Sequence, residues 1–433
     1  MCYSIPGKII SIDKKIATVD YFGETKKAVN EFVGAKPGEF VYVQGGFVID
    51  KVSPKKALRV LADWRDIFFK LKAADARISR LPEDMPRNSK VLGVFNKISG
   101  NSIPSWNEIK EILEIKDRRE LELLYNTANS VRQRYHQNSC CVHGIIEISN
   151  FCERNCFYCG ISCLNKDLKR YRMTKKEIMK AVDIAVRKYG FKALVLQSGE
   201  SGQYSVKELD EIIRGIRKTY GVLVFISFGE MEKKDLKRLY DAGARGLLMR
   251  FETSNKELYK RLHPGYDLDE RLKCIKDACG LGYLIITGSL VGIPGATVDD
   301  VVNDLYLASD LNPEMLSFGP FLPHPDTPLA GAPRPKEDDI LKVLALARFI
   351  GPKDAKVVVT TGFETLTRSA RRKGLMAGAS SVMLNVTPVE NRKLYSIYPN
   401  RAHERETIRR QIDDTIQLLK KLGRAPTDLG MKL

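Results

Sequence analysis

The sequence predicts an α/β protein, a (βα)8 TIM-type barrel with a small N-terminal all-β barrel domain. After residue 144, short apolar runs alternate with helical patterns of about ten to fifteen residues, as in repeated βα units. A polar or glycine-rich stretch follows each run, where the loops of such a barrel converge. The N-terminal residues instead predict short strands separated by turns. A chain of 433 residues is long enough for both parts.

The small barrel is expected in residues 1–57, and residues 58–104 are expected to form a helix and a linker. Strands of the small barrel are predicted at residues 8–12, 16–20, 26–29, 40–44 and 47–52. From Pro54 onward, apolar residues recur at helical spacing. Prolines and glycines then interrupt the chain between Pro82 and Pro104, which indicates a linker.

The large barrel is expected in residues 105–433, with leading helices and a C-terminal extension. The leading helices are predicted at residues 105–115 and 118–135, the first with Ser105 as its N-cap. The eight strands are predicted at residues 145–148, 193–196, 223–226, 246–249, 283–287, 315–318, 356–359 and 381–384.

The amino-acid composition argues against a nucleic-acid-binding protein, a disulfide-rich protein and a membrane protein. Lysine and arginine number 71 against 53 aspartates and glutamates, a net charge of +18 that favours anionic partners. No helix-turn-helix, RNP or zinc-finger pattern accompanies this excess, so nucleic-acid binding is not expected and solvated charge is the simpler explanation. Nine cysteines without a signal-like N-terminus or a long apolar run predict a cytoplasmic protein with neither a disulfide framework nor a membrane span.

The most informative motif is FCERNCFYCG at residues 151–160. Three and two residues separate its cysteines Cys152, Cys156 and Cys159. A C-x-x-C pair alone would also suit zinc or a redox disulfide. A loop with three thiolates holds a [4Fe–4S] cluster and leaves the fourth iron open to a ligand that is not protein. The triple spacing therefore favours such a cluster.

Several motifs together resemble the radical S-adenosylmethionine (SAM) superfamily, in its biotin-synthase-like branch. Within that branch, the chain is similar to the HydE family of [FeFe]-hydrogenase maturases from about residue 118 to residue 399. The motifs that carry the resemblance are IIEISNFCERNCFYCG, DLKRYRMT, LVLQSGES, GSLVGIPG, GPFLPHPDTPL and TPVENRKLYSIYP. The resemblance implies that a [4Fe–4S] cluster and SAM are cofactors, and that reductive cleavage of SAM yields a 5′-deoxyadenosyl radical.

The resemblance also implies which residues hold SAM. These are polar residues near the ends of the predicted strands: Gln197, Ser227, Glu252 and Arg271 in contact with SAM, and Glu200, Glu230 and Arg250 close by. Tyr158 would lie beside the cluster and the adenine. An arginine suits the carboxylate of SAM, and carboxylates suit its amine and ribose. For Arg250, Glu252 and Arg271, a salt bridge at the barrel rim is the alternative.

Four further residues match positions that surround the substrate in the HydE family. Thr360 and Thr361 would bind its carboxylate, and Met383 and Tyr395 would line the cavity. His143 stands where the family has an arginine ahead of the first cluster cysteine. It is either a proton-dependent anion contact or a rim histidine with ordinary protein partners. Replacement of the family's arginine by His143 removes a fixed positive charge. We therefore expect the substrate to differ from that of the HydE family.

The start of the chain, MCYSIPGK, and the segment VYVQGGFVI at residues 41–49 resemble the HypC family of hydrogenase-assembly chaperones. In that family, the cysteine after the initiator methionine helps to hold an iron that carries CO and cyanide. Cys2 is therefore a candidate iron ligand. Gln44, however, stands where the family usually has histidine, and glutamine is a poor iron ligand. The small domain is thus either an iron carrier or only a docking domain.

The expected function is that of an anaerobic radical SAM enzyme in the assembly of a hydrogenase-type metal cofactor. Its substrate is expected to be small, to bear a carboxylate, and to contain sulfur or be bound to iron. Expected partners are an electron donor such as ferredoxin or flavodoxin and other cofactor-assembly proteins. Two alternatives stay open: a carbon-skeleton mutase similar to methylornithine synthase, and a non-catalytic iron chaperone that acts through Cys2.

Overall fold

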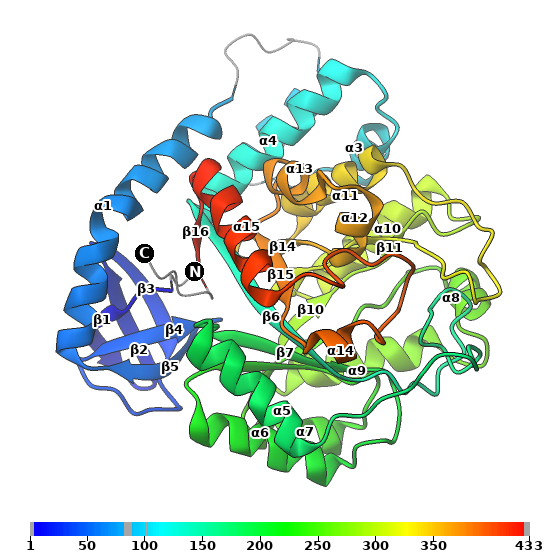
Figure 1. Ribbon diagram of the computed structural model, residues 1–433. Coiled ribbons are helices and arrows are strands. Elements are labelled where there is room, and N and C mark those ends of the chain that lie inside the picture. The colour runs from blue at the N-terminus through cyan, green and yellow to red at the C-terminus, as the bar shows by residue number, and fades with distance from the viewer. Residues whose placement is uncertain (1–3, 82–88, 101, 428–433) are drawn as a thin grey trace.

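Two β-barrels joined by helices make up the protein in the computed structural model, which describes residues 4–81, 89–100 and 102–427 (Figure 1). The N-terminal residues form the small barrel, and residues from Ser139 onward form the large one. Cys2, the predicted iron ligand, lies outside the described residues.

The small barrel closes with the strand order β1-β2-β3-β5-β4. Its strands are β1 (Gly7–Asp13), β2 (Ile16–Tyr21), β3 (Glu24–Val29), β4 (Phe40–Gln44) and β5 (Phe47–Val52). In β2, the alternate residues Ala17, Val19 and Tyr21 are buried, because successive side chains of a strand point to opposite faces. The predicted all-β domain and its five strands are confirmed.

Among the residues that the structure describes, four helices lead from the small barrel to the large one. They are α1 (Pro54–Ile78), α2 (Lys90–Ser99), α3 (Trp106–Leu113) and α4 (Arg118–His136). Helix α1 packs Trp64 and Phe68 into the core of the small barrel. The segment that was expected to be a linker also contains a helix, α2, which the sequence analysis did not predict. The Ser89 side chain caps this helix, and Val91 and Val94 are buried at helical spacing.

Eight parallel strands close the large barrel in chain order, with β15 pairing to β6. They are β6 (Ser139–Ser149), β7 (Ala193–Ser198), β8 (Leu223–Ser227), β9 (Ala244–Leu248), β10 (Leu284–Thr287), β12 (Met315–Leu316), β14 (Lys356–Val359) and β15 (Ser381–Asn385). All eight overlap the predicted strands. Strand β6 begins earlier than predicted because its first residues pair with a short strand near the C-terminus, β16 (Ala425–Pro426).

Helices surround the large barrel, and shorter elements lie among its loops (Figure 1). The longer helices are α5 (Lys175–Asp183), α6 (Val206–Thr219), α7 (Lys233–Ala242), α9 (Leu268–Gly280), α10 (Val298–Asp310), α11 (Glu337–Ile350) and α15 (Ile408–Lys421). The shorter elements are η1 (Ile184–Lys188), α8 (Lys256–Leu262), β11 (Leu290–Val291), β13 (Gly319–Pro320), α12 (Thr361–Leu366), α13 (Ala370–Met376) and α14 (Val389–Arg392). Among the described helices, none has the length and apolar character needed to cross a membrane.

The small barrel docks on the N-terminal end of the large barrel. At the turn between β4 and β5, a Cβ atom at Gly45 would lie 2.7 Å from δ-carbons of Leu223 and Leu284, the first residues of β8 and β10. Phe47 belongs to the same buried cluster as residues inside the large barrel. Gln44 donates a hydrogen bond from Nε2 to the backbone oxygen of Thr427. The side chain that replaces the family's histidine is therefore bound to the backbone near the C-terminus.

Replacing Gly45 with valine is expected to weaken this docking by about 1–3 kcal/mol, the usual cost of overpacking. The new side chain would overlap the two leucines, and the φ of +51° at Gly45 already favours glycine. Urea unfolding followed by circular dichroism measures the loss. Gly23→Val is the matched control, because its φ is +94° but no atom lies within 4 Å of a Cβ there. An equal loss of unfolding free energy in Gly45→Val and Gly23→Val would contradict tight packing between the two barrels at Gly45.

Candidate active site

A cavity of about 270 Å³ lies at the C-terminal ends of the large-barrel strands, opposite the small barrel. Its volume is near the lower end of the range for ligand pockets, which starts at about 300 Å³. Most of the predicted site residues line it: Cys152, Cys156, Cys159, Tyr158, Gln197, Ser227, Arg250, Glu252, Arg271, Thr360, Thr361, Met383 and Tyr395. The structure thus brings together residues from almost every strand end.

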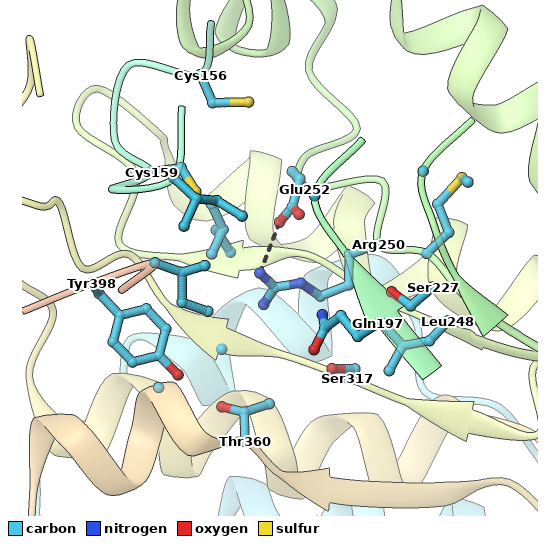
Figure 2. Close-up of a pocket in the computed structure, with 18 of the residues that line it drawn as sticks. Cys156, Cys159, Gln197, Ser227, Leu248, Arg250, Glu252, Ser317, Thr360 and Tyr398 are labelled. Carbon is cyan, nitrogen blue, oxygen red and sulfur yellow. Dashed lines mark ion pairs between the residues drawn. The ribbon is translucent and has the colours of Figure 1, made fainter. Parts of the chain in front are cut away.

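The three cysteines stand on the irregular loop between β6 and α5, and Figure 2 shows Cys156 and Cys159 on one side of the cavity. Arg170 fastens this loop by donating hydrogen bonds to backbone oxygens at N–O distances of 2.6–3.2 Å; these belong to Asn150, Ile161, Ser162 and Asn165. The loop also touches the rim after β7, where a Cβ at Gly199 would lie 2.2 Å from the Phe151 oxygen. The position of the cysteines is therefore set by packing.

The three cysteine thiols are free side chains at the cavity, and each could bind one iron of a cluster. None of the three forms a disulfide, and burial raises the pKa of each thiol, to about 12 for Cys159. Within the described part of the chain, no three histidine, cysteine or acidic side chains converge as ligands of one ion would. A [4Fe–4S] cluster does not require this, because each thiolate binds a different iron, and ligation deprotonates the thiol.

Glu252 is the best-placed residue to hold SAM. The side chain is only 10% exposed, and no described group donates a hydrogen bond to its Oε2. The nearest cation is Arg250, whose Nη2 lies 3.4 Å from Oε2 (Figure 2). The rim salt bridge is thus present, but it leaves the carboxylate open to a further donor. Because a buried acceptor without a donor is costly, an amine or hydroxyl group of SAM would fit here.

Arg271 is held mainly by protein groups. Its Nη1 lies 3.0 Å from Oε1 of both Glu200 and Glu230, and its Nε donates to the backbone oxygen of Arg250 at 2.6 Å. Arg154 pairs with the same two carboxylates. Burial raises the pKa of Glu200, but the two guanidinium groups outweigh it and hold this pKa at about 2. Arg271 thus makes the salt bridge that was the alternative to a SAM contact, and it also lines the cavity. Glu230 is not among the residues that line the cavity.

Tyr158 is fixed by His263, the C-cap residue of α8. The two side chains approach to 3.1 Å between the phenol oxygen and Nε2. Burial lowers the pKa of His263 to about 3, so the imidazole is neutral. Its Nδ1 donates to the backbone oxygen of Tyr259, and Nε2 therefore accepts from Tyr158.

The predicted substrate residues Thr360, Thr361, Met383 and Tyr395 line the cavity, and Figure 2 shows Thr360 across the cavity from Cys156. A Cβ built at Gly319 would lie 2.9 Å from Nη1 of Arg250 and 3.2 Å from Oγ1 of Thr360. A guanidinium and a hydroxyl group therefore border the same small space. This pair can donate hydrogen bonds to a carboxylate.

The cavity wall also includes Tyr395 and Tyr398, from the segment after α14. This segment contacts the cysteine loop, because the Gly160 amide donates to the backbone oxygen of Ile397 at 2.9 Å. A buried ion pair fastens that segment to the barrel: Arg401 donates to both carboxylate oxygens of Glu147, with an Nη2–Oε2 distance of 3.0 Å. The side chains of both charged residues are less than 5% exposed. The segment is thus held over the site by a paired, hydrogen-bonded contact.

His143 does not line the cavity. It lies two residues before Ile145, which does, so strand alternation places its side chain deeper in the barrel. Its Nε2 is 3.0 Å from Sγ of Cys141, and its ring centroid is 5.0 Å from that of Phe225. This position matches a histidine with ordinary protein partners and does not support an anion contact in the cavity.

Sequence reasoning missed Arg154, Tyr398 and the Glu147–Arg401 pair. Arg154 carries a usable signal, because it is a charged residue between two predicted cluster ligands. Tyr398 follows Tyr395 by three residues in the same motif. The Glu147–Arg401 pair has no local signal, because the two residues are 254 positions apart.

Replacing Glu252 with glutamine is expected to weaken SAM binding to the cluster-loaded enzyme about tenfold, because a charge-assisted hydrogen bond contributes about 1.5–3 kcal/mol. Isothermal titration calorimetry under anaerobic conditions measures the dissociation constant. Glu257→Gln serves as the control, since that carboxylate is 87% exposed on α8. Unchanged affinity in Glu252→Gln would exclude Glu252 as a SAM ligand.

Residues 146–308 match the Radical SAM superfamily, residues 1–64 match the HupF/HypC family, and residues 317–425 match the Biotin and Thiamin Synthesis associated domain. The barrel, the three-cysteine loop and these matches define the protein as a radical SAM enzyme. Because the protein is an enzyme, the alternative of a non-catalytic iron chaperone is excluded.

The "[FeFe] hydrogenase maturase subunit HydE" of Thermotoga maritima is 39% identical over 318 residues, which cover 73% of this chain and 90% of that protein. The chain belongs to the HydE family and carries an additional N-terminal domain of the HupF/HypC family. A more distant relative is the 3-methylornithine synthase of Methanosarcina barkeri, 27% identical over 74% of this chain and 89% of its own length.

Solved structures show the same fold. Methylornithine synthase (PylB) superposes with a TM-score of 0.68 at 24% identity and covers 77% of this chain and 97% of its own. The maturase HydG from Carboxydothermus hydrogenoformans reaches a TM-score of 0.67 at 18% identity, over 84% of this chain and 85% of its own. The predicted barrel architecture is confirmed.

Proposed function

We propose that this enzyme cleaves SAM reductively at a [4Fe–4S] cluster bound by Cys152, Cys156 and Cys159, as part of the assembly of a hydrogenase-type metal cofactor. One observation carries the proposal: a single cavity has these cysteines on one side and Thr360 and Thr361 on the other. When bound, the cluster and SAM supply an electron and a 5′-deoxyadenosyl radical. The substrate is small, bears a carboxylate, and contains sulfur or is bound to iron.

The residues of the chain orient the reactants and keep water out. Glu252 accepts a hydrogen bond from SAM, and Gln197 and Ser227 meet SAM from the ends of β7 and β8. Arg250 and Thr360 hold the substrate carboxylate, because their donor groups border the same space. Tyr395 and Tyr398 form part of the cavity wall, and the buried Glu147–Arg401 pair fixes the segment that carries them.

The role in cofactor assembly draws support from relatives. The HydE of Thermotoga maritima is named as a maturase subunit, and the N-terminal domain matches a family of hydrogenase-assembly chaperones. The enzyme accordingly receives its electron from a donor such as ferredoxin or flavodoxin and passes its product to other assembly proteins. Because Gln44 is bound to the Thr427 backbone, the small domain acts chiefly as a docking domain.

The test is product analysis with the anaerobically reconstituted, reduced full-length enzyme. With SAM and a small sulfur-containing amino acid, free or bound to iron, we expect 5′-deoxyadenosine to form faster than in the absence of substrate, together with a modified substrate. Lysine is the comparison, and no conversion of it is expected. Conversion of lysine to an isomer, with no turnover of the sulfur or iron compound, would overturn the proposal and favour the methylornithine-synthase type of reaction.

A further inference from the structure

Four buried or partly buried charges pack against the cysteine loop and form a neutral cluster, here called the charge quartet: Arg154, Glu200, Glu230 and Arg271. Arg154 comes from the loop itself, between Cys152 and Cys156. Its Nε lies 2.7 Å from Oε2 of Glu200, and its Nη2 pairs with Glu230. Arg271 completes the quartet from α9 with two contacts of 3.0 Å.

Arg154 is held in place from two sides. Its guanidinium carbon lies 3.7 Å from the centroid of the Tyr266 ring, and its side chain is 8% exposed. The backbone of the loop joins the same arrangement, because the Glu153 amide donates to the backbone oxygen of Glu200 at 2.8 Å. A planar, forked guanidinium can meet two carboxylates and an aromatic ring at once, which a lysine cannot do.

Glu200 lies beside the side chains that would bind the cluster. Its side chain lines the same cavity as Cys152 and Cys156. A Cβ atom at Gly199, the residue before Glu200, would lie 2.8 Å from the Cβ of Cys152. Arg154 stands between these two cysteines in the chain and pairs directly with the Glu200 carboxylate, so it compensates an anion next to the ligand sites.

We propose that Arg154 is a positioning residue that neutralises Glu200 beside the cluster and thereby raises the reduction potential of the cluster. The inference rests on the proposed cluster at Cys152, Cys156 and Cys159. Reduction adds one electron, and so one negative charge, to the cluster. Local net charge is one of the factors that set the reduction potential of an iron–sulfur cluster. The low dielectric constant of a buried site strengthens the effect of a nearby charge on this potential. Without Arg154, reduction would occur next to an uncompensated carboxylate.

Variants of the charge quartet separate this role from a purely structural one. The parent quartet has two positive and two negative charges, a net charge of zero. Arg154→Met changes the net charge to −1 and Glu200→Gln changes it to +1. The double variant returns to zero with Arg271 and Glu230 still paired. If the two residues have only structural roles, the double variant should be at least as defective as either single variant. If their effect is electrostatic, the opposite shifts in reduction potential should cancel in the double variant.

The experiment is an anaerobic redox titration of each reconstituted full-length protein without SAM, with the reduced cluster followed by electron paramagnetic resonance. For Arg154→Met we expect about tenfold less reduced cluster at a given ambient potential, a shift of about 59 mV to more negative potential for a one-electron couple. Glu200→Gln is expected to shift to more positive potential, and the double variant to lie near the parent. Arg170→Lys is the matched control, because Arg170 binds only backbone oxygens of the loop. It is expected to hold less cluster at an unchanged potential.

An unchanged potential in Arg154→Met with intact cluster would overturn the inference. If Arg154→Met fails to bind a cluster, Glu200→Gln decides, and the absence of a positive shift there would overturn it equally. A parent that binds no cluster would instead refute the proposed function. A parent with a normal cluster and no activity on the proposed substrates would leave the inference about Arg154 intact.

Discussion

Replacing Cys152 with alanine is expected to abolish the formation of 5′-deoxyadenosine from SAM. The loop would then offer two thiolates instead of three, and a cluster bound by three cysteines loses one of its protein ligands. No other cysteine of the loop is placed to substitute without moving a packed backbone, because Arg170 and the Gly199 rim hold the loop in place. The variant should contain little iron and show no cluster signal after reconstitution.

Iron content, electron paramagnetic resonance and 5′-deoxyadenosine production by chromatography measure this result. Cys163→Ala is the matched control: Cys163 follows Cys159 by four residues and also has a partly buried side chain. It is expected to bind a cluster and cleave SAM like the parent. Parental activity in Cys152→Ala would show that the three cysteines do not hold the catalytic cluster.

Replacing Asp75 with alanine is expected to lower the free energy of unfolding by about 3–5 kcal/mol, as for the loss of one partner of a buried ion pair. Asp75 receives two hydrogen bonds of 2.8 Å from Arg132 and one of 3.0 Å from Arg424. All three side chains are at most 1% exposed. The variant would leave two buried guanidinium groups without their carboxylate. It would also disconnect α1 from α4 and from the segment before β16.

Urea unfolding of the cluster-free protein, followed by circular dichroism, gives the free energy of unfolding for comparison with the parent. Asp241→Ala is the control, because Asp241 pairs with Lys237 on the surface of α7, with both side chains more than half exposed. Such a pair contributes at most about 1 kcal/mol. A loss below 1 kcal/mol in Asp75→Ala would mean that the buried network does not hold α1 to the barrel.

Features that depend on near neighbours in the chain were predictable. The alternation of apolar runs with helical patterns placed all eight barrel strands, because strand and helix periods are local properties of the sequence. Ser105 caps α3 in a capping box with Glu108, three residues along the chain. The three-cysteine loop belongs to the same group, because its ligands lie within eight residues.

Pairings between distant residues were not predictable in the same way. Arg271 was expected to contact SAM and Glu230 to lie close by, and in the charge quartet Arg271 pairs with both Glu230 and Glu200. The sequence indicates that these residues lie near the strand ends. Which of their charges are paired with one another in the absence of a ligand depends on how the loops at the strand ends pack. The two alternatives for His143 could not be separated from the sequence, since the predicted strand began only at residue 145 and the depth of His143 in the barrel depends on packing.

The sequence by itself determined the class of fold, the cysteine loop and the side of the barrel where the chemistry lies. Periodicity and short spacings encode these features within a few residues. Only the tertiary structure decided that the small barrel closes the opposite end, that Gln44 binds the Thr427 backbone, and that Arg154 faces two carboxylates. Each of these depends on contacts between segments far apart in the chain, and such contacts exist only once the two barrels have packed.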